Sequence, residues 1–128
     1  MRCCVDCHVR ADWGSNAARE SKRAAAAIAD ETNTVLVSAA SAWEIATKHR
    51  IGKLPGVEQA LREFNELIIA DGFSHLAVAH NHAIKAGGFD VDHRDPFDRM
   101  LAAQAVIESA VLVTDDSAMK LFRVKCLW

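Results

Sequence analysis

Four acidic residues stand at positions where a carboxylate could bind a metal ion. Asp6 and Asp116 each follow a short apolar segment typical of a buried strand. Glu44 and Asp98 each lie in an otherwise apolar segment with helical character. An ionised carboxylate near a core is costly unless it is paired or bound to a metal. Oxygen ligands suit hard cations such as Mg²⁺ or Mn²⁺, which can activate water and neutralise a phosphodiester, so we expect one acidic pocket with hydrolytic chemistry.

Two of these acids also have a structural explanation at a helix N-terminus. Asp95 fits the N-cap of a helix that begins at Pro96, and Asp98 would then favour the helix dipole from the first turn. Asp115 or Asp116 could likewise cap the short helix that follows them. In each pair we predict that the earlier acid, Asp95 or Asp115, is the cap and that the later one is the metal ligand.

Glu44 and Asp6 are less easily explained by local structure. Ser41 and Glu44 match a capping box, in which a serine is followed three residues later by a glutamate. If Ser38 is the N-cap instead, Glu44 lies two turns into the helix and needs another reason to be there. Asp6 could form a turn, but it lies at the end of a strand, where parallel sheets bind ligands.

Basic side chains flank the predicted pocket. Arg94 and Arg99 lie on either side of the Asp95–Asp98 segment, and either could reach a phosphate. The histidines have no metal-binding spacing, and we interpret them as surface residues; those considered are His8, His80, His82 and His93.

Length, charge and cysteine content narrow the class of protein. A chain of 128 residues with no linker or repeat is expected to form a single domain, residues 1–128. The net charge of −2 gives no global basic field for nucleic acid, although local cations beside a metal could still bind phosphate. No apolar run has the ~20 residues of a membrane span and no signal peptide is evident, so we expect a cytoplasmic protein without membrane contact. The cysteines do not form a disulfide framework, and Cys3 and Cys4 should point to opposite faces of a strand.

Strand-like and helical segments alternate along the chain. We predict strands at 2–5, 34–37, 75–78, 111–114 and 123–127, and helices at 19–29, 41–50, 57–70, 80–86, 96–108 and 115–122. This alternation indicates an α/β fold with a mostly parallel sheet and helices on both faces. Ligands gather at the carboxyl ends of such strands, where Asp6 and Asp116 are expected.

The sequence resembles the PIN-domain family, and specifically the VapC-like toxins of bacterial type II toxin–antitoxin systems. The resemblance rests on segments 5–8, 37–46, 52–55 and 112–116 and on the motif His93-Arg94-Asp95-Pro96-Phe97-Asp98-Arg99. It implies a PIN-like three-layer α/β/α sandwich and a Mg²⁺-dependent endoribonuclease toxin for which Mn²⁺ substitutes. It also implies an RNA substrate, a cognate antitoxin, a homodimer and contact with operator DNA only through the antitoxin.

The same resemblance assigns roles to individual residues. Asp6, Glu44, Asp98 and Asp116 match the four family acids in order, and we expect all four to be catalytic. Asp6 and Asp98 look like the best metal ligands, with Glu44 and Asp116 completing the shell directly or through water. Thr114 is expected to orient a ligand or a water by its hydroxyl, and with Arg94 and Arg99 it is a candidate for substrate contact.

One segment departs from the family pattern, and it motivates an alternative. Arg10, Asp12 and Gly14 interrupt the apolar helix that usually follows the first acid. A catalytically inactive PIN-like protein that only binds an antitoxin is therefore the first alternative. A phospho-acceptor receiver-like domain, prompted by Asp115 and Asp116, is the second, but that pair comes too late in the chain for the usual receiver order.

Overall fold

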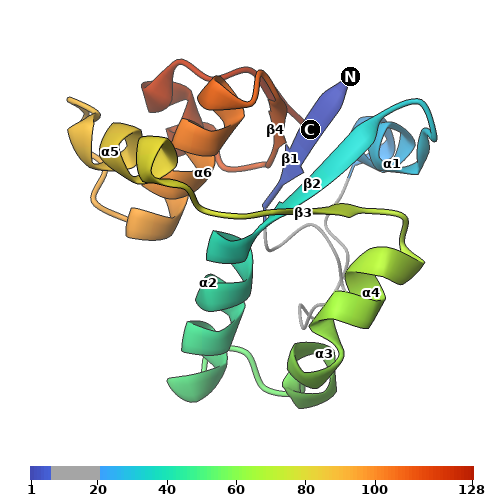
Figure 1. Ribbon diagram of the computed structural model, residues 1–128. Helices are drawn as coiled ribbons and strands as arrows, with labels where there is room; N and C mark the ends of the chain where they lie inside the picture. The colour runs from blue at the N-terminus through green and yellow to red at the C-terminus, as the bar shows by residue number, and fades with distance from the viewer. Residues whose placement is uncertain (7–20) are drawn as a thin grey trace.

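A five-stranded, all-parallel sheet organises the part of the chain that the structure describes, residues 1–6 and 21–128, in a computed structural model (Figure 1). The strand order is β3-β2-β1-β4-β5, so that β1 is central. The strands are β1 (Arg2–Val5), β2 (Thr34–Ser38), β3 (Ser74–Leu76), β4 (Val111–Val113) and β5 (Cys126–Leu127). The α-helices are α1 (Lys22–Ala29), α2 (Ala39–Arg50), α3 (Glu58–Arg62), α4 (Phe64–Ala70), α5 (His80–Gly88) and α6 (Pro96–Ile107), and η2 (Ser117–Phe122) is a 3₁₀-helix.

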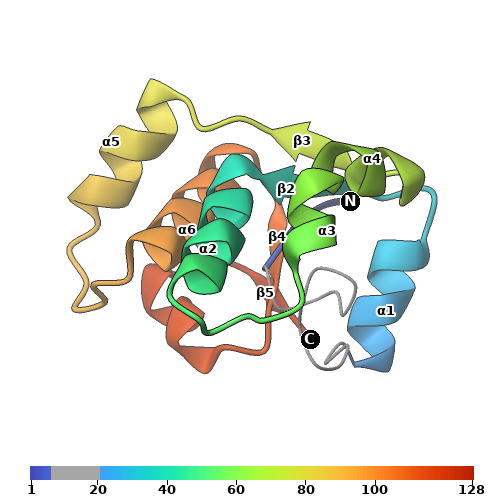
Figure 2. The ribbon, with the colours of Figure 1, turned by 90° about the horizontal axis from the view of Figure 1, so that it is seen from below.

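Helices cover both faces of the sheet, which confirms the predicted three-layer α/β/α architecture. Successive strand residues point to opposite faces: Cys3 packs in one core with α1, α3 and α4, and Cys4 packs in the other with α6 and η2. Figures 1 and 2 show these two helical layers on either side of the strands, with α5 lying against α6. The prediction that Cys3 and Cys4 face opposite ways is confirmed.

The structure corrects several predicted boundaries. Segment 57–70 is two helices instead of one, because the backbone at Glu63 leaves the helical region with φ −108° and ψ 21°. This bend lets α3 pack against α2 while α4 packs against the edge strand β3. The predicted helix at 115–122 is a 3₁₀-helix that begins only at Ser117, and the last strand is shorter than expected.

Two features of the sequence analysis lie outside the described residues. These are the interruption of the first helix by Arg10, Asp12 and Gly14, and His8, one of the histidines assigned to the surface. Within residues 1–6 and 21–128, none of the helices has the length and apolar character that a membrane crossing demands.

The carboxyl edge of the sheet positions the acidic residues. β1 and β4 are neighbours in register, with Val5 opposite Val113, so Asp6 and Thr114 leave the sheet side by side. The Asp6 N–H continues the ladder by donating to the Val113 carbonyl over 3.2 Å. β2 passes directly into α2 at Ser38, which carries Glu44 to the same edge.

Candidate active site

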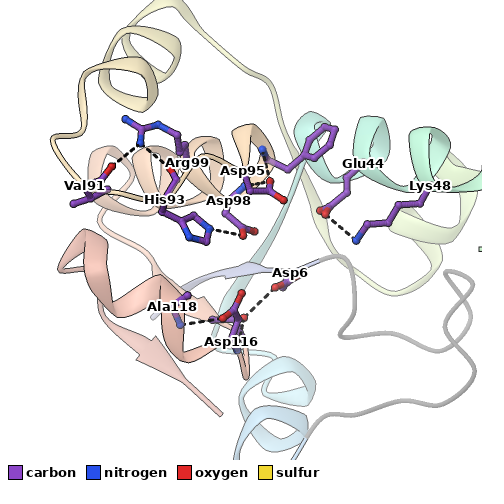
Figure 3. Close-up of polar contacts among 12 residues, drawn as sticks. Asp6, Glu44, Lys48, Val91, His93, Asp95, Asp98, Arg99, Asp116 and Ala118 are labelled. Carbon is purple, nitrogen blue, oxygen red and sulfur yellow. Dashed lines mark hydrogen bonds and ion pairs between the residues drawn. The ribbon is translucent and has the colours of Figure 1, made fainter. Parts of the chain in front are cut away.

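Thr114 connects Asp6 and Asp116, the acids that follow two neighbouring strands and that Figure 3 labels. Its Oγ1 donates a hydrogen bond to Oδ2 of Asp6 over 3.0 Å and accepts one from the backbone N–H of Asp116 over 3.1 Å. Both side chains are almost wholly buried, Thr114 at 4% and Asp6 at 7% exposure. Since a hydroxyl that accepts from one group can aim its own proton at another, Thr114 fixes the orientation of the Asp6 carboxylate.

Asp116 combines a capping role with its place beside Thr114. Its carboxylate accepts a hydrogen bond from the N–H of Ala118 over 2.9 Å and caps η2. The prediction that Asp115 is the cap is therefore wrong, because the 3₁₀-helix begins at Ser117, which makes Asp116 the N-cap. Asp115 is exposed. Asp116 keeps its second carboxylate oxygen for another partner, so the capping bond leaves the predicted ligand role open.

Asp98 lies in the first turn of α6 as predicted. Asp95 is the N-cap, accepting from the N–H groups of Phe97 and Asp98 over 2.9 and 3.1 Å, and Pro96 takes the first helical position. The backbone of Asp98 is thus fixed by a conventional helix start. Its side chain takes no part in the cap; instead, its Oδ2 lies 2.8 Å from Nε2 of His93.

The electrostatic environment of Asp98 shows that the acids converge. Burial raises the pKa of Asp98 to about 6, and the hydrogen bond from His93 partly opposes that rise. Repulsion from Asp95, Asp6 and Glu44 raises this pKa further. Asp6 and Glu44 come from other elements of the fold, and Figure 3 shows their carboxylates around the same region as that of Asp98.

The side chain of Glu44 is buried, and the start of α2 decides between the two predicted N-caps, Ser38 and Ser41. Ser38 is the N-cap, accepting from the N–H of Ala40 over 3.0 Å, and Ser41 makes no capping box. Glu44 is only 4% exposed and forms an ion pair with Lys48 one turn later, at 2.9 Å. A charge buried this deeply normally has a charged partner or a function. Lys48 is such a partner for Glu44.

Arg99 is engaged with the backbone, and Arg94 is exposed. The guanidinium of Arg99 has five N–H groups. The structure gives it five carbonyl acceptors in the last turn of α5 and in the loop that leads to α6: Ala86, Gly87, Phe89, Val91 and His93. This arrangement favours a role for Arg99 in shaping that segment over one in binding a phosphate. Arg94 stays a candidate for substrate contact.

Sequence reasoning missed several residues around the acids. His93 was interpreted as a surface residue, but it contacts Asp98, and its position in a loop gave no periodic signal. His82 was assigned to the surface as well, yet it is buried and lies 3.0 Å from Glu108, at the opposite end of α6 from Asp98 and away from the predicted site. Arg23 and Lys120 were not singled out, and with Thr114 and Asp116 they line a cavity of about 280 Å³.

The chemistry of these donors fits a hard divalent cation. Carboxylates and a threonine hydroxyl supply only oxygen, which Mg²⁺ and Mn²⁺ prefer. In the described part of the chain, no three His, Cys, Asp or Glu side chains meet closely enough to form a metal cluster by themselves. Mg²⁺ usually keeps several waters and takes only one or two carboxylates from the protein, so this spacing suits a cation held partly through water.

The all-parallel sheet, with acids at its carboxyl edge, is the arrangement expected of a PIN domain. Residues 4–125 match the family model "PIN domain", and the chain therefore belongs to this family. A 57-residue stretch is 44% identical to "Ribonuclease VapC16" of Mycobacterium tuberculosis (strain ATCC 25618 / H37Rv). That stretch covers 44% of this chain and 40% of the relative. The comparisons confirm the resemblance to VapC-like PIN proteins.

Proposed function

We propose that this chain is a metal-dependent endoribonuclease that hydrolyses RNA phosphodiester bonds as the toxin of a type II toxin–antitoxin system. The observation that carries the proposal is the placement of Asp6, Glu44 and Asp98 around one region at the carboxyl edge of the sheet (Figure 3). The name of the relative, a ribonuclease, supports the choice of RNA as substrate. A cytoplasmic location belongs to the same proposal.

We assign a separate role to each acid. Asp6, Asp98 and Asp116 would hold Mg²⁺, or Mn²⁺ in its place, and Glu44 would polarise the attacking water. Thr114 keeps the Asp6 carboxylate in one orientation through its 3.0 Å hydrogen bond. When bound, the cation lowers the pKa of water and neutralises charge that builds up on the phosphate.

Cations beside the acids are suited to the RNA backbone. Arg23 on α1 and Lys120 on η2 line the cavity that also contains Thr114 and Asp116. Arg94, exposed next to the N-cap of α6, offers a further positive charge. Phosphate contacts of this kind position a nucleic acid without reading its sequence.

Cleavage of RNA by matched variants tests this proposal. Purified protein should cleave RNA with Mg²⁺ or Mn²⁺, and Asp98→Asn should abolish cleavage without unfolding the protein. Asp92→Asn is the matched control, because Asp92 is an exposed acid in the adjoining loop. Equal cleavage by wild type and Asp98→Asn would rule out the assignment of Asp98.

A partner helix is the expected inhibitor. An apolar cavity of about 420 Å³ lies between α2, α5 and α6, and its walls include Trp43, Val78, Phe97 and Met100. Trp43 is 62% exposed there. An amphipathic antitoxin helix could bury its apolar face in such a groove. Homodimerisation, and contact with operator DNA only through the antitoxin, complete the proposal.

This apolar surface also keeps the binding-only alternative open. A PIN-like protein without catalysis would need the antitoxin surface but no metal. Calorimetric titration with Mn²⁺ separates the two functions, since the absence of heat with all four acids intact would favour the alternative.

A further inference from the structure

His93 reaches back over the start of α6 to the side chain of Asp98. Its Nε2 lies 2.8 Å from Oδ2 of Asp98, and the two side chains are 19% and 16% exposed. A carboxylate oxygen accepts hydrogen bonds, so in this contact the Nε2–H of His93 is the donor and Oδ2 of Asp98 is the acceptor. His93 therefore donates to one oxygen of Asp98 and leaves the other oxygen available.

The imidazole of His93 is held in place by its own surroundings. Its ring meets the buried ring of Phe122 edge to face, with centroids 5.4 Å apart and planes at 89°. Phe122 in turn packs against Phe89, with centroids 4.9 Å apart. This aromatic packing restricts the ring to one orientation, so that its N–H points steadily at Asp98.

The backbone of His93 is held by Arg99. The His93 carbonyl accepts a 2.9 Å hydrogen bond from the Arg99 guanidinium, which also binds the carbonyl of Val91. Arg99 follows Asp98 directly on α6, so the helix that carries the acid also anchors the loop that carries its hydrogen-bond donor. The two contacts form a closed link between α6 and residue 93 (Figure 3).

We infer that His93 is a positioning residue that holds Oδ2 of Asp98 so that Oδ1 keeps a constant direction toward the divalent cation. The inference rests on the proposed function, because it requires Asp98 to bind that cation. Carboxylates that bind metals are commonly held by such hydrogen bonds, and losing the partner typically lowers metal affinity by about 10- to 100-fold. His93 touches neither the cation nor RNA in this account.

Two substitutions of His93 distinguish the effect of its hydrogen-bond donor from the effect of its aromatic ring. His93→Phe keeps an aromatic ring against Phe122 but removes the N–H, whereas His93→Gln keeps an N–H donor and removes the ring. Calorimetric titration with Mn²⁺ at neutral pH should show about 10- to 100-fold weaker binding for His93→Phe. His93→Gln should stay close to wild type. Both variants should give a wild-type circular dichroism spectrum before titration.

A measurement on the unmodified protein covers the case in which His93→Phe does not fold. In ¹⁵N-histidine-labelled wild type, Mg²⁺ should shift the ring nitrogen signals of His93. His80, which is exposed at the start of α5, should not shift. An unmoved His93 signal under saturating Mg²⁺ overturns the inference.

The outcomes distinguish this inference from the proposed function. Wild type that does not bind Mn²⁺ overturns both. Wild type that binds, together with His93→Phe that binds equally well, overturns the role of His93 alone. Equal weakening in His93→Phe and His93→Gln also overturns it, because the ring and not the donor would then matter. Weak binding in His93→Phe with rescue in His93→Gln supports it.

Discussion

The hydroxyl of Thr114 donates a 3.0 Å hydrogen bond to the carboxylate of Asp6, although 108 positions separate the two residues in the sequence. The bond joins the ends of β1 and β4, which lie side by side in the parallel sheet. The same hydroxyl accepts a hydrogen bond from the backbone N–H of Asp116. Thr114 therefore contacts two of the four acids, Asp6 and Asp116.

Removing the hydroxyl of Thr114 should therefore affect both folding and cleavage. Thr114→Val preserves the shape of the side chain but removes the hydroxyl donor to Asp6, and we expect a loss of about 1–3 kcal/mol in the free energy of unfolding. Thr114→Ser keeps the hydroxyl and should retain most of that stability and most of the cleavage rate. Urea titration and an RNA cleavage assay provide the measurements. If Thr114→Val behaves as wild type in both, the hydrogen bond has no energetic role.

Metal binding should depend on pH through Asp98. The pKa of Asp98 in the folded protein is raised to about 6, chiefly by burial. Below that pH a proton occupies the Asp98 carboxylate and competes with the cation. Mn²⁺ affinity should therefore rise between pH 5 and 7 and level off at higher pH. Calorimetric titrations across this range measure the effect. A flat profile in which affinity at pH 5 equals that at pH 7 would contradict it.

The same raised pKa predicts that Asp98→Asn stabilises the metal-free protein near pH 7. The folded pKa lies above the unfolded value of roughly 4, so this contribution to stability is present below pH ~4 and is lost as the pH rises through about 6. A neutral amide removes the cost and still accepts from His93. After allowance for solvent screening we expect a gain on the order of 1 kcal/mol. Chemical denaturation in a chelating buffer measures it, with Asp92→Asn as the unchanged control.

Arg99→Lys should destabilise the protein although it keeps the charge. Lysine has three donors on a single nitrogen and cannot reach the five carbonyls that the planar guanidinium binds. We expect a loss of about 2–4 kcal/mol, from several hydrogen bonds to a charged group. Arg94→Lys, at an exposed position, should leave the unfolding midpoint unchanged. Equal midpoints for Arg99→Lys and wild type would show that the carbonyl contacts add nothing.

Lys120→Ala should weaken RNA binding without affecting the acids. Lys120 lines the cavity beside Thr114 and Asp116, and a lost phosphate contact should reduce the slope of log affinity against log salt by about 1. Binding is measured by fluorescence anisotropy in the Asp98→Asn background, so that the RNA stays intact. Lys125→Ala is the control at an exposed position that does not line this cavity. Unchanged affinity and slope for Lys120→Ala would exclude this path for the RNA.

Local patterns predicted most of the fold, and for a physical reason. Short continuous apolar segments placed the inner strands, because a strand that lies between two helical layers must bury both faces. Asp95 and Pro96 predicted the start of α6 because capping is a matter of a few neighbouring residues. The bend at Glu63 escaped prediction, since it arises from the separate surfaces against which α3 and α4 pack.

The sequence by itself indicated acids at the ends of predicted strands and in predicted helices. The family resemblance then identified Asp6, Glu44, Asp98 and Asp116 as the four expected site acids. Only the tertiary structure decided that Asp116 caps η2, that His93 holds Asp98 and that Arg99 binds the preceding loop. These contacts depend on how the chain leaves a helix or crosses a loop, where no periodicity constrains it. A few such hydrogen bonds give fixed orientations to the acids that the sequence could only list.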